Sequence, residues 1–419
     1  RIQRCIRFYC VKDVGKIRSS FPALKRKALN GKPVIYFDGP GASQMPNRVN
    51  RAYNDHVLYD KANAGGYFET SVNTTEEVGR ARLALSMFMN CDEDEVVLGA
   101  NATTSIFQFS RALCRNWTSE DEIVVTKLDH FANVSPWVEV AHDKNCKVTS
   151  IGFDTNTGKY NLEDFEKAIT TKTKIVAVNY ACNAIGTISP IKEITKIAHA
   201  KGAMVFVDAV HYAPHRLIDV KDLDCDFLVT SIYKYFGPHV SAVFAKKQHL
   251  QNFSPYKVEP ASDIIPNRWE TGTPDFSAIA AIPSTIKYIA SLSDKSGTTR
   301  KNLEIAYQKI TEYENELSKY FLNKLFELKK VKVLGISDTD EVENRTPTFG
   351  LIVDGKTSHQ TAKYLAKHGI FAWSGHFYAL DVVREYNLEK DGILRIGMLH
   401  YNTKREIKEF ISVLKLFTS

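Results

Sequence analysis

A carboxylate and a lysine lie at the ends of two short apolar segments in the middle of this chain. Residues 204–208 read MVFVD and end on Asp208, and residues 227–231 read FLVTS and are soon followed by Lys234. Apolar runs of this length predict buried strands. Because ligands bind beyond the carboxyl ends of the strands in open α/β sheets, we expect Asp208 and Lys234 to face one site.

These two groups are the pair that pyridoxal phosphate (PLP) chemistry needs. A lysine amine forms a Schiff base with PLP, and an acid keeps the pyridine nitrogen protonated so that the ring accepts electrons from a substrate carbanion. The competing interpretation is an ordinary α/β protein in which Asp208 is a capping residue and Lys234 a surface residue. The pair alone leaves both interpretations open.

Hydroxyl groups suited to a phosphate occur at two places. Thr103 and Thr104 lie in GANATTSI, between an expected strand and an expected helix, where free N–H groups and the helix dipole favour an anion. Ser231 and Tyr233 come just before Lys234 and offer two more donors. A plain threonine N-cap is the alternative for the first pair.

Other polar residues are candidates for contacts with a ring or a substrate. His130, in LDHFANVSPW, has an imidazole that can stack on a pyridine ring and shuttle a proton. Asn183 can hydrogen-bond a phenolic oxygen, and His211 can brace the ring or its acidic partner. Arg395 lies between apolar residues, and its guanidinium fork suits a carboxylate. The alternatives are a structural role for His130, turn formation for Asn183 and a structural ion pair for Arg395.

Strand and helix patterns alternate from Glu95 onward, which predicts a mostly parallel sheet with helices on both faces. Before it, residues 45–60 and 73–90 are expected to be helices, the second with a T-x-x-E capping box at Thr74. After about Ser277 the pattern changes to a long helix over residues 301–329, and then to paired strands and helices. This change suggests a smaller α+β domain.

Length and composition limit the class of protein. A chain of 419 residues exceeds what one core usually supports, so we expect an arm over residues 1–35, a large domain over 36–290 and a small domain over 291–419. Its 44% hydrophobic and 25% charged residues are typical of a globular protein. The net charge of +7 is dispersed, and no apolar run approaches a membrane span. We therefore expect no nucleic-acid, membrane or metal site.

The seven cysteines form no C-x-x-C pair and are odd in number, which favours a reducing cytosol over a disulfide framework. The first ten residues are basic and lack acids. They are compatible with the remnant of a targeting segment, although the apolar core of a signal peptide is missing. A cytoplasmic location is expected, and an organelle is not excluded.

In their order and spacing, these segments resemble the class V aminotransferase family of fold-type I PLP enzymes, and specifically its cysteine desulfurase-like branch. The resemblance runs from about Asp13 to the C-terminus, and TSIYK and VDAVH are its most specific segments. It implies a mostly parallel seven-stranded sheet in the large domain, a smaller α+β C-terminal domain, and a homodimer with shared active sites acting on an amino acid.

The resemblance also implies roles for individual residues. Lys234 would hold PLP and act with His130, which stacks on the ring, and with Asp208, which pairs with the pyridine nitrogen. Asn183 and His211 would lie beside the ring. The residues implied at the phosphate are Thr104, Ser231, Tyr233 and, from the second subunit, Thr273, and Thr103 stays a further candidate for cofactor binding. Arg395 would take the substrate carboxylate.

The chain departs from that branch where a desulfurase needs a cysteine. The group it most resembles carries a G-H-x-C motif, whereas this chain reads Gly375-His376-Phe377-Tyr378. Tyrosine cannot carry a persulfide, because that role needs a thiolate nucleophile. Trp373 stands where an arginine is common, and residues 39–42 read GPGA where the desulfurases have N-A-A. We expect Trp373, Phe377 and Tyr378 to form an aromatic wall of the substrate pocket, and His376 to be a further substrate-binding residue.

The remaining groups still support chemistry at the substrate Cα. The leading expectation is a C–S lyase that releases pyruvate, ammonia and a sulfur product. An epimerase or aminotransferase of the same fold is the alternative, as is a PLP-binding protein without turnover. Ordinary desulfurase activity would need another cysteine, and Cys182, next to Asn183, is the one expected near the site.

Overall fold

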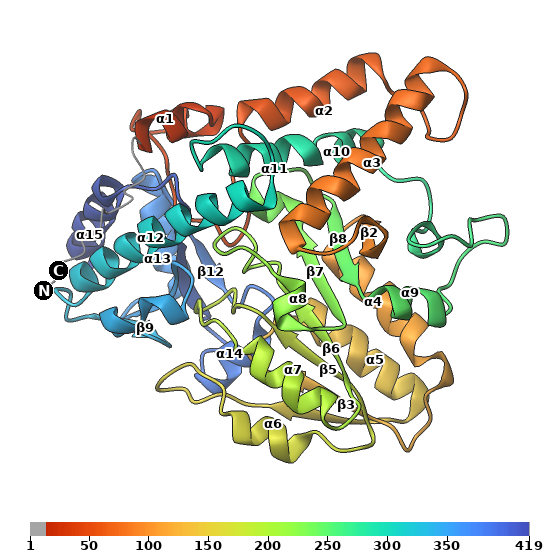
Figure 1. Cartoon of the computed structure of the whole chain (residues 1–419). Coiled ribbons are helices and arrows are strands. Elements are labelled where there is room, and N and C mark those ends of the chain that lie inside the picture. The colour runs from red at the N-terminus through yellow and green to blue at the C-terminus, as the bar shows by residue number, and fades with distance from the viewer. Residues whose placement is uncertain (1–13, 419) are drawn as a thin grey trace, which may run out of the picture.

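The computed structural model describes residues 14–418, which form two main sheets and one two-stranded sheet, surrounded by helices (Figure 1). The expectations for the basic residues 1–10 and for the start of the arm lie outside the described residues. The larger sheet has seven strands in the order β2-β8-β7-β6-β5-β3-β4. In that order the strands are Val96–Gly99, Ser241–Ala245, Phe227–Ser231, Met204–Asp208, Thr173–Asn179, Glu122–Thr126 and Lys147–Ile151.

Strand β8 is antiparallel to both of its neighbours, and the other pairs in this sheet are parallel. The expected mostly parallel seven-stranded sheet is therefore confirmed. Sequence patterning did not predict β8, because its five residues follow β7 through a short turn with no α-helix between the two strands.

Successive residues of the central strands face two separate cores, as the pleat of a strand requires. Val205 and Val207 pack on the face covered by α3 (Glu69–Met89) and α7 (Ile191–His199). Phe206, between them, packs on the face covered by α4 (Ala102–Leu113) and α5 (Ser135–Lys144). This two-sided burial explains why the strands read as continuous apolar runs.

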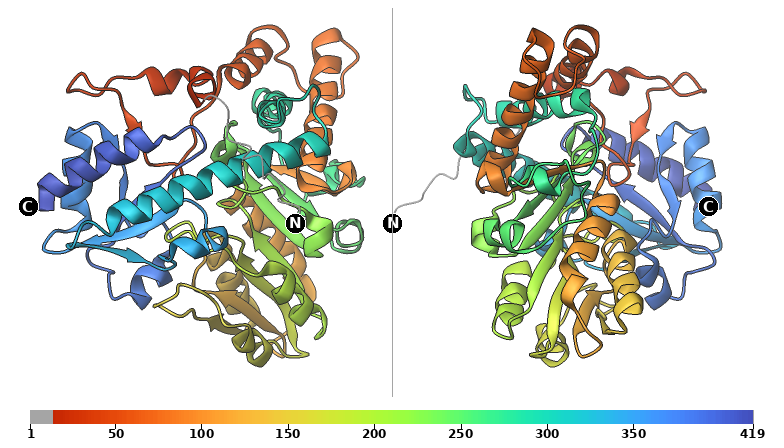
Figure 2. Two further views of the ribbon diagram at one scale, coloured as in Figure 1. Left: turned by 60° about the vertical axis from the view of Figure 1, so that its left-hand side comes forward. Right: turned by 90° about the vertical axis from the view of Figure 1, so that its right-hand side faces the viewer.

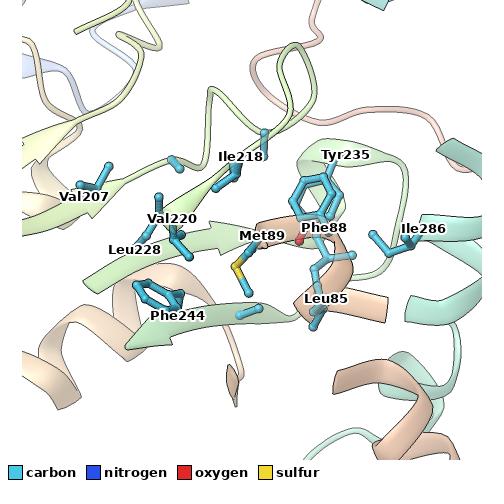
Figure 3. Close-up of a cluster of buried hydrophobic side chains, with 14 of the residues drawn as sticks. Leu85, Phe88, Met89, Val207, Ile218, Val220, Leu228, Tyr235, Phe244 and Ile286 are labelled. Atoms are coloured by element: carbon cyan, nitrogen blue, oxygen red, sulfur yellow. The ribbon is translucent and has the colours of Figure 1, made fainter. Parts of the chain in front are cut away.

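One contact in the first core fixes the turn that carries Lys234. Tyr235 stacks on Phe88 of α3, with ring centroids 5.0 Å apart (Figure 3). Its hydroxyl also shares a 3.0 Å hydrogen bond with Thr230, on β7. The residue after Lys234 is thus anchored in the hydrophobic core.

A second sheet of four antiparallel strands lies toward the C-terminus, in the order β12-β13-β10-β9. These strands are Trp373–Gly375, Ile393–Gly397, Thr348–Val353 and Val331–Leu334. The helices α13 (Ser358–Lys367) and α15 (Lys404–Thr418) accompany it. Residues 34–38 contribute only β1 (Ile35–Tyr36), which pairs in parallel with β11 (Ile370–Phe371).

The long helix α12 (Arg300–Leu325) joins the two cores, and Figure 2 shows it running between the two sheets. Leu303 and Ile310 belong to the core of the large sheet, whereas Phe321 and Leu325 belong to the core of the small one. The remaining α-helices are α1 (Val14–Ser19), α2 (Asn47–Tyr59), α6 (Leu162–Ala168), α8 (Val220–Leu223), α9 (Lys247–Asn252), α10 (Phe276–Ala280), α11 (Ile282–Ser291) and α14 (Leu380–Glu385).

The expected capping box at Thr74 is wrong. Helix α3 begins earlier, at Glu69, so Thr74 lies inside it and its hydroxyl donates to the Thr70 carbonyl at 2.9 Å. Helix α7 ends at His199, shortly before Gly202, which has a φ of +80°. Between residues 14 and 418, no helix is long and apolar enough to cross a membrane.

Candidate active site

Lys234 lies in a short 3₁₀ turn, Ile232–Tyr235, directly after β7. Its Nζ donates to the carbonyl oxygen of Gly41 at 2.8 Å and to that of Pro40. Burial lowers the pKa of Lys234 to about 7, and the charge of Arg395 adds to this effect. A buried amine that is partly neutral at physiological pH is a competent nucleophile for a carbonyl.

Asp208 ends β6, the strand beside β7, so the pleat and register of the sheet bring it to the same cavity as Lys234. Its Oδ1 accepts a 2.8 Å hydrogen bond from the Val210 N–H. Burial raises the pKa of Asp208 to about 6, while this hydrogen bond and Lys234 oppose the rise. The expectation that the two residues face one cavity agrees with this geometry.

His130 lines the same cavity from the loop after β3. Its Nδ1 accepts a 3.0 Å hydrogen bond from the Ala132 N–H, so the neutral ring carries its proton on Nε2. Burial lowers the pKa of His130 to about 4, and the positive charges of Lys234 and Arg395 contribute. His130 is therefore a neutral ring, suited to stacking.

Asp129, which the sequence reasoning missed, holds the loop that presents His130. Its carboxylate accepts hydrogen bonds of 3.0 Å from the Asn133 side chain and from the Asn179 N–H, and another from the Thr126 hydroxyl. Burial raises its pKa well above the usual value. Its place directly before His130 was the only signal in the sequence.

His211 also lines the cavity, and its Nε2 shares a 3.1 Å hydrogen bond with the Thr346 hydroxyl. Burial lowers its pKa well below the usual value. Behind it, His215 shares a 2.8 Å hydrogen bond with Glu314, a fully buried residue of α12. The loop after β6 is thus tied to the helix that joins the two cores.

The structure separates the two threonines of GANATTSI. Thr103 lines the Lys234 cavity, as do Ser231 and Tyr233, whereas Thr104 lines a neighbouring hollow together with Thr273 of the same chain. Asn101 caps α4, because its side chain accepts the Thr104 N–H at 2.9 Å. A threonine N-cap is therefore wrong as an explanation of these residues.

Arg395, on β13 of the small sheet, reaches the residues of the large sheet. Its Nη1 donates to the Asn183 carbonyl at 3.1 Å, and its guanidinium carbon lies 4.0 Å from the centroid of the Phe377 ring. The Arg395 Nε and the Asn183 Oδ1 are both buried without a hydrogen-bond partner. Unfilled polar atoms of this kind mark a place for a ligand group.

Asp38, another residue that the sequence reasoning missed, adds a half-buried acid close enough to Arg395 and Lys234 to interact with both charges. A bridge between Asp38 and Gly397 fixes the segment beside β13, and the Asp38 Oδ1 has no hydrogen-bond partner. Burial raises the pKa of Asp38 to about 6, against the opposing charges of Arg395 and Lys234.

The segment Gly375–Tyr378 covers the site in a strained conformation. Gly375, Phe377 and Tyr378 have φ values of +126°, +54° and +59°, and the last two carry side chains that disfavour this region by about 1 kcal/mol or more each. Two hydrogen bonds hold the turn: Phe131 N–H to Tyr378 O at 2.7 Å, and Asn183 Nδ2–H to Phe377 O at 2.9 Å. The turn is therefore fastened to both sides of the site.

The side chains of this segment do not line the cavity itself. They lie around the residues that do. The Tyr378 ring stacks on His130 with centroids 5.1 Å apart, and the His376 Nδ1 accepts the Tyr378 N–H at 3.1 Å. Trp373 lies opposite Arg395 on the paired strand. Trp373 and Tyr378 remain 55% and 66% exposed.

These residues fit PLP. A partly neutral lysine, a buried carboxylate and a neutral imidazole converge on one cavity, and unpartnered polar atoms lie beside it. When bound, PLP supplies an electron sink for the bonds at the substrate Cα. Lys234 would hold it, with Asp208 at the pyridine nitrogen and His130 against the ring.

Comparisons with known proteins agree with this assignment. The family described as Aminotransferase class-V matches residues 35–410. A probable cysteine desulfurase from Borreliella burgdorferi is 32% identical, over 97% of this chain and 96% of the relative. An aminotransferase-like protein from Gibberella zeae is 29% identical, over 96% of this chain and 98% of the relative.

Among solved structures, the apo cysteine desulfurase from Thermococcus onnurineus superimposes with a TM-score of 0.85 at 26% identity. That match covers 96% of this chain and 98% of the other. With the cavity built around Lys234 and Asp208, these findings establish that the chain belongs to the class-V aminotransferase family, in its cysteine desulfurase-like branch, and is a PLP-dependent enzyme.

Proposed function

We propose that the protein is a C–S lyase that acts on a sulfur-bearing amino acid by β-elimination and needs no persulfide-carrying cysteine. The observation that carries the proposal is Tyr378. It stands where the resemblance requires the sulfur-accepting cysteine, and its ring is stacked on His130 while two main-chain hydrogen bonds hold its turn. A phenol at this place accepts no sulfur atom.

The cysteines of the described chain support the same proposal. Cys182 is next to Asn183, but it is fully buried among apolar residues, and burial raises the pKa of its thiol to about 11. A persulfide carrier must be a thiolate that reaches both the substrate and an acceptor. Cys182 meets neither requirement, so sulfur is released with the leaving group.

The residues of the site have matching roles in this reaction. Arg395 would bind the substrate carboxylate through its unpartnered Nε, and Asn183 would offer its free Oδ1 beside it. Lys234, released from the carbonyls of Pro40 and Gly41, would take the proton from Cα. The Cβ–S bond then breaks with its electron pair on sulfur, and water yields pyruvate and ammonia.

A homodimer with shared active sites belongs to the same proposal. Thr273 lines the hollow beside Thr104, at the edge of the cofactor cavity, where a second subunit would complete the phosphate site. Leu58, Tyr59 and Phe68 leave large apolar surfaces exposed on a single chain, as residues of a subunit contact do. We also place the protein in the cytoplasm, because the five described cysteines are all free.

The test is to incubate the PLP-loaded protein with L-cysteine, cystine and S-substituted cysteines and to assay pyruvate. Pyruvate formation that Lys234→Ala abolishes would support the proposal. Inversion at Cα without a keto acid would replace it with epimerisation, and an amino-acid-dependent keto acid that retains its sulfur would replace it with transamination. A change in cofactor absorbance without any product would indicate a binding protein.

A further inference from the structure

Two departures from the desulfurase pattern touch each other at the entrance of the site. A Cβ added to Gly41 would lie 3.0 Å from the Nε1 of Trp373 and 3.1 Å from the main-chain oxygen of Asp38, which is tight for both neighbours. Glycine at position 41 therefore makes room for tryptophan at position 373. The carbonyl of this same Gly41 accepts the hydrogen bond from Lys234. Gly41 therefore lies between the indole of Trp373 and the reacting amine of Lys234.

Trp373 also lies beside the group that takes the substrate carboxylate. It pairs with Arg395 across the antiparallel strands β12 and β13, so that both side chains are on one face of the sheet. The Phe377 ring occupies one side of the Arg395 guanidinium, at 4.0 Å. When a substrate is bound between Arg395 and Lys234, Trp373 is next to both the carboxylate end and the amine end of that substrate.

A second exposed ring, that of Tyr378, packs on a residue of the cavity wall. Tyr378 stacks on His130, which lines the cavity, and about two thirds of its surface remains exposed. Both rings of this pair, Trp373 and Tyr378, keep more than half of their surface exposed on the described chain. Exposed aromatic surface beside a reactive group gains free energy by covering an apolar ligand.

We propose that Trp373 and Tyr378 form the pocket for the sulfur substituent, and that the substrate is an S-substituted cysteine with a flat apolar group, such as an S-arylmethyl cysteine, rather than L-cysteine. The inference rests on the proposed β-elimination and deepens it. The Cα–H and Cβ–S bonds break, the thiolate leaves with the electron pair, and one water accounts for pyruvate and ammonia.

The experiment compares S-benzyl-L-cysteine with S-methyl-L-cysteine on the PLP-loaded enzyme. Dissociation constants come from the change in cofactor absorbance, which needs no turnover, and pyruvate is assayed in parallel. The benzyl compound is expected to bind at least about tenfold more tightly, since its ring exchanges water for two aromatic walls. Equal affinity for the two compounds would overturn the inference.

Three variants locate the preference. Trp373→Ala is expected to reduce the benzyl-to-methyl ratio to below about threefold, and Gly41→Ala to reduce it as well, because the added methyl displaces the indole. Gly152→Ala is the matched control, since a Cβ there meets nothing within 4 Å. An unchanged benzyl-to-methyl ratio in Trp373→Ala would contradict the proposal. Sedimentation shows whether the variant also alters a subunit contact, and the conclusion holds in either case.

The two levels of the proposal fail separately. Tight, Trp373-dependent binding of the benzyl compound without pyruvate would leave the pocket in place and make the reaction type wrong. Pyruvate from L-cysteine at a rate equal to or above that from S-benzyl-L-cysteine, with no difference in affinity, would support the lyase and overturn the substrate class.

Discussion

The ring of Tyr378 lies against the imidazole of His130, with centroids 5.1 Å apart and planes inclined by 25°, while the Tyr378 carbonyl accepts the N–H of Phe131 at 2.7 Å. The side chain and the main chain of one residue thus hold the same loop of the large sheet. A persulfide-carrying loop must move between substrate and acceptor, whereas this one is fastened at both its ring and its backbone.

Restoring a cysteine at this position should therefore not restore sulfur transfer. In Tyr378→Cys the hydrogen bonds to the carbonyls of Phe377 and Tyr378 persist, because they belong to the main chain. We expect pyruvate to remain the main product from L-cysteine, with alanine at under about a tenth of it, a difference of roughly 1.4 kcal/mol in barrier. Tyr378→Phe, which keeps the ring, is the control. Alanine as the main product, with persulfide on Cys at position 378, would refute this view of the turn.

The capture of PLP by the apoprotein should follow the titration of Lys234. Only the neutral amine attacks the PLP aldehyde, and burial lowers the pKa of Lys234 to about 7. The rate of cofactor uptake is thus expected to rise with pH to a midpoint near 7, where an ordinary lysine would give a midpoint of about 10.4. The rise in visible absorbance after mixing measures it. A rate that still climbs in proportion to hydroxide up to pH 9 would contradict the assigned shift.

Asp38 should move that midpoint. Its negative charge favours the ammonium form of Lys234 and so opposes the lowering of the lysine pKa. Asp38→Asn keeps the shape and removes the charge, so the midpoint of PLP uptake is expected to shift to lower pH. The exposed Asp55→Asn, on α2, serves as the control. If the midpoint of PLP uptake moves to higher pH in Asp38→Asn, the charge of Asp38 does not favour the ammonium form of Lys234.

At the opposite ends of the strands, Asp226 should make stability depend on pH. Although burial alone would raise its pKa, hydrogen bonds of 2.8 Å from His199, His249 and the Val205 N–H hold the pKa of Asp226 below its usual value. The Asp226 hydrogen bond raises the pKa of His199, against burial. Asp226 therefore stabilises the fold above about pH 3.9 and loses that effect as the pH falls, whereas His199 stabilises it below about pH 6.5 and loses its effect as the pH rises.

The contribution of this cluster is thus largest between about pH 4 and 6.5. Asp226→Asn is expected to lower the free energy of unfolding by about 3 kcal/mol at pH 6 and by less at pH 9. Urea denaturation at the two pH values measures the difference. A penalty that is the same at both pH values would mean that His199 does not titrate with Asp226.

The sequence predicted the parts of the site that depend on single strands and the loops that follow them. Asp208, Lys234 and His130 follow apolar runs directly, and the ends of neighbouring strands meet at one edge of a sheet. Thr103 and Thr104 could not be separated in this way, because successive helical residues point about 100° apart, and only the packing of α4 decides which one faces the cavity.

Asp38 was beyond sequence reasoning for a different reason. It reaches the site through a bridge to Gly397. This pairing joins segments near the two ends of the chain, and no local sequence pattern predicts it. The antiparallel strand β8 was missed likewise, since only its partners on both sides define it. Local patterns in the sequence predict single helices and strands. The pairing of segments far apart in the sequence decides which acidic residues lie beside the lysine.

The measurement that tests the central claim most directly is a mass balance of the products formed from carbon-labelled L-cysteine and S-benzyl-L-cysteine by the PLP-loaded enzyme. Labelled pyruvate and alanine are quantified in the same sample, together with the free thiol or sulfide. The account predicts pyruvate in an amount equal to the sulfur product, which is sulfide from L-cysteine and the thiol from S-benzyl-L-cysteine, without alanine and without persulfide on the protein. Alanine formed in step with a persulfide on any cysteine of the chain would contradict it.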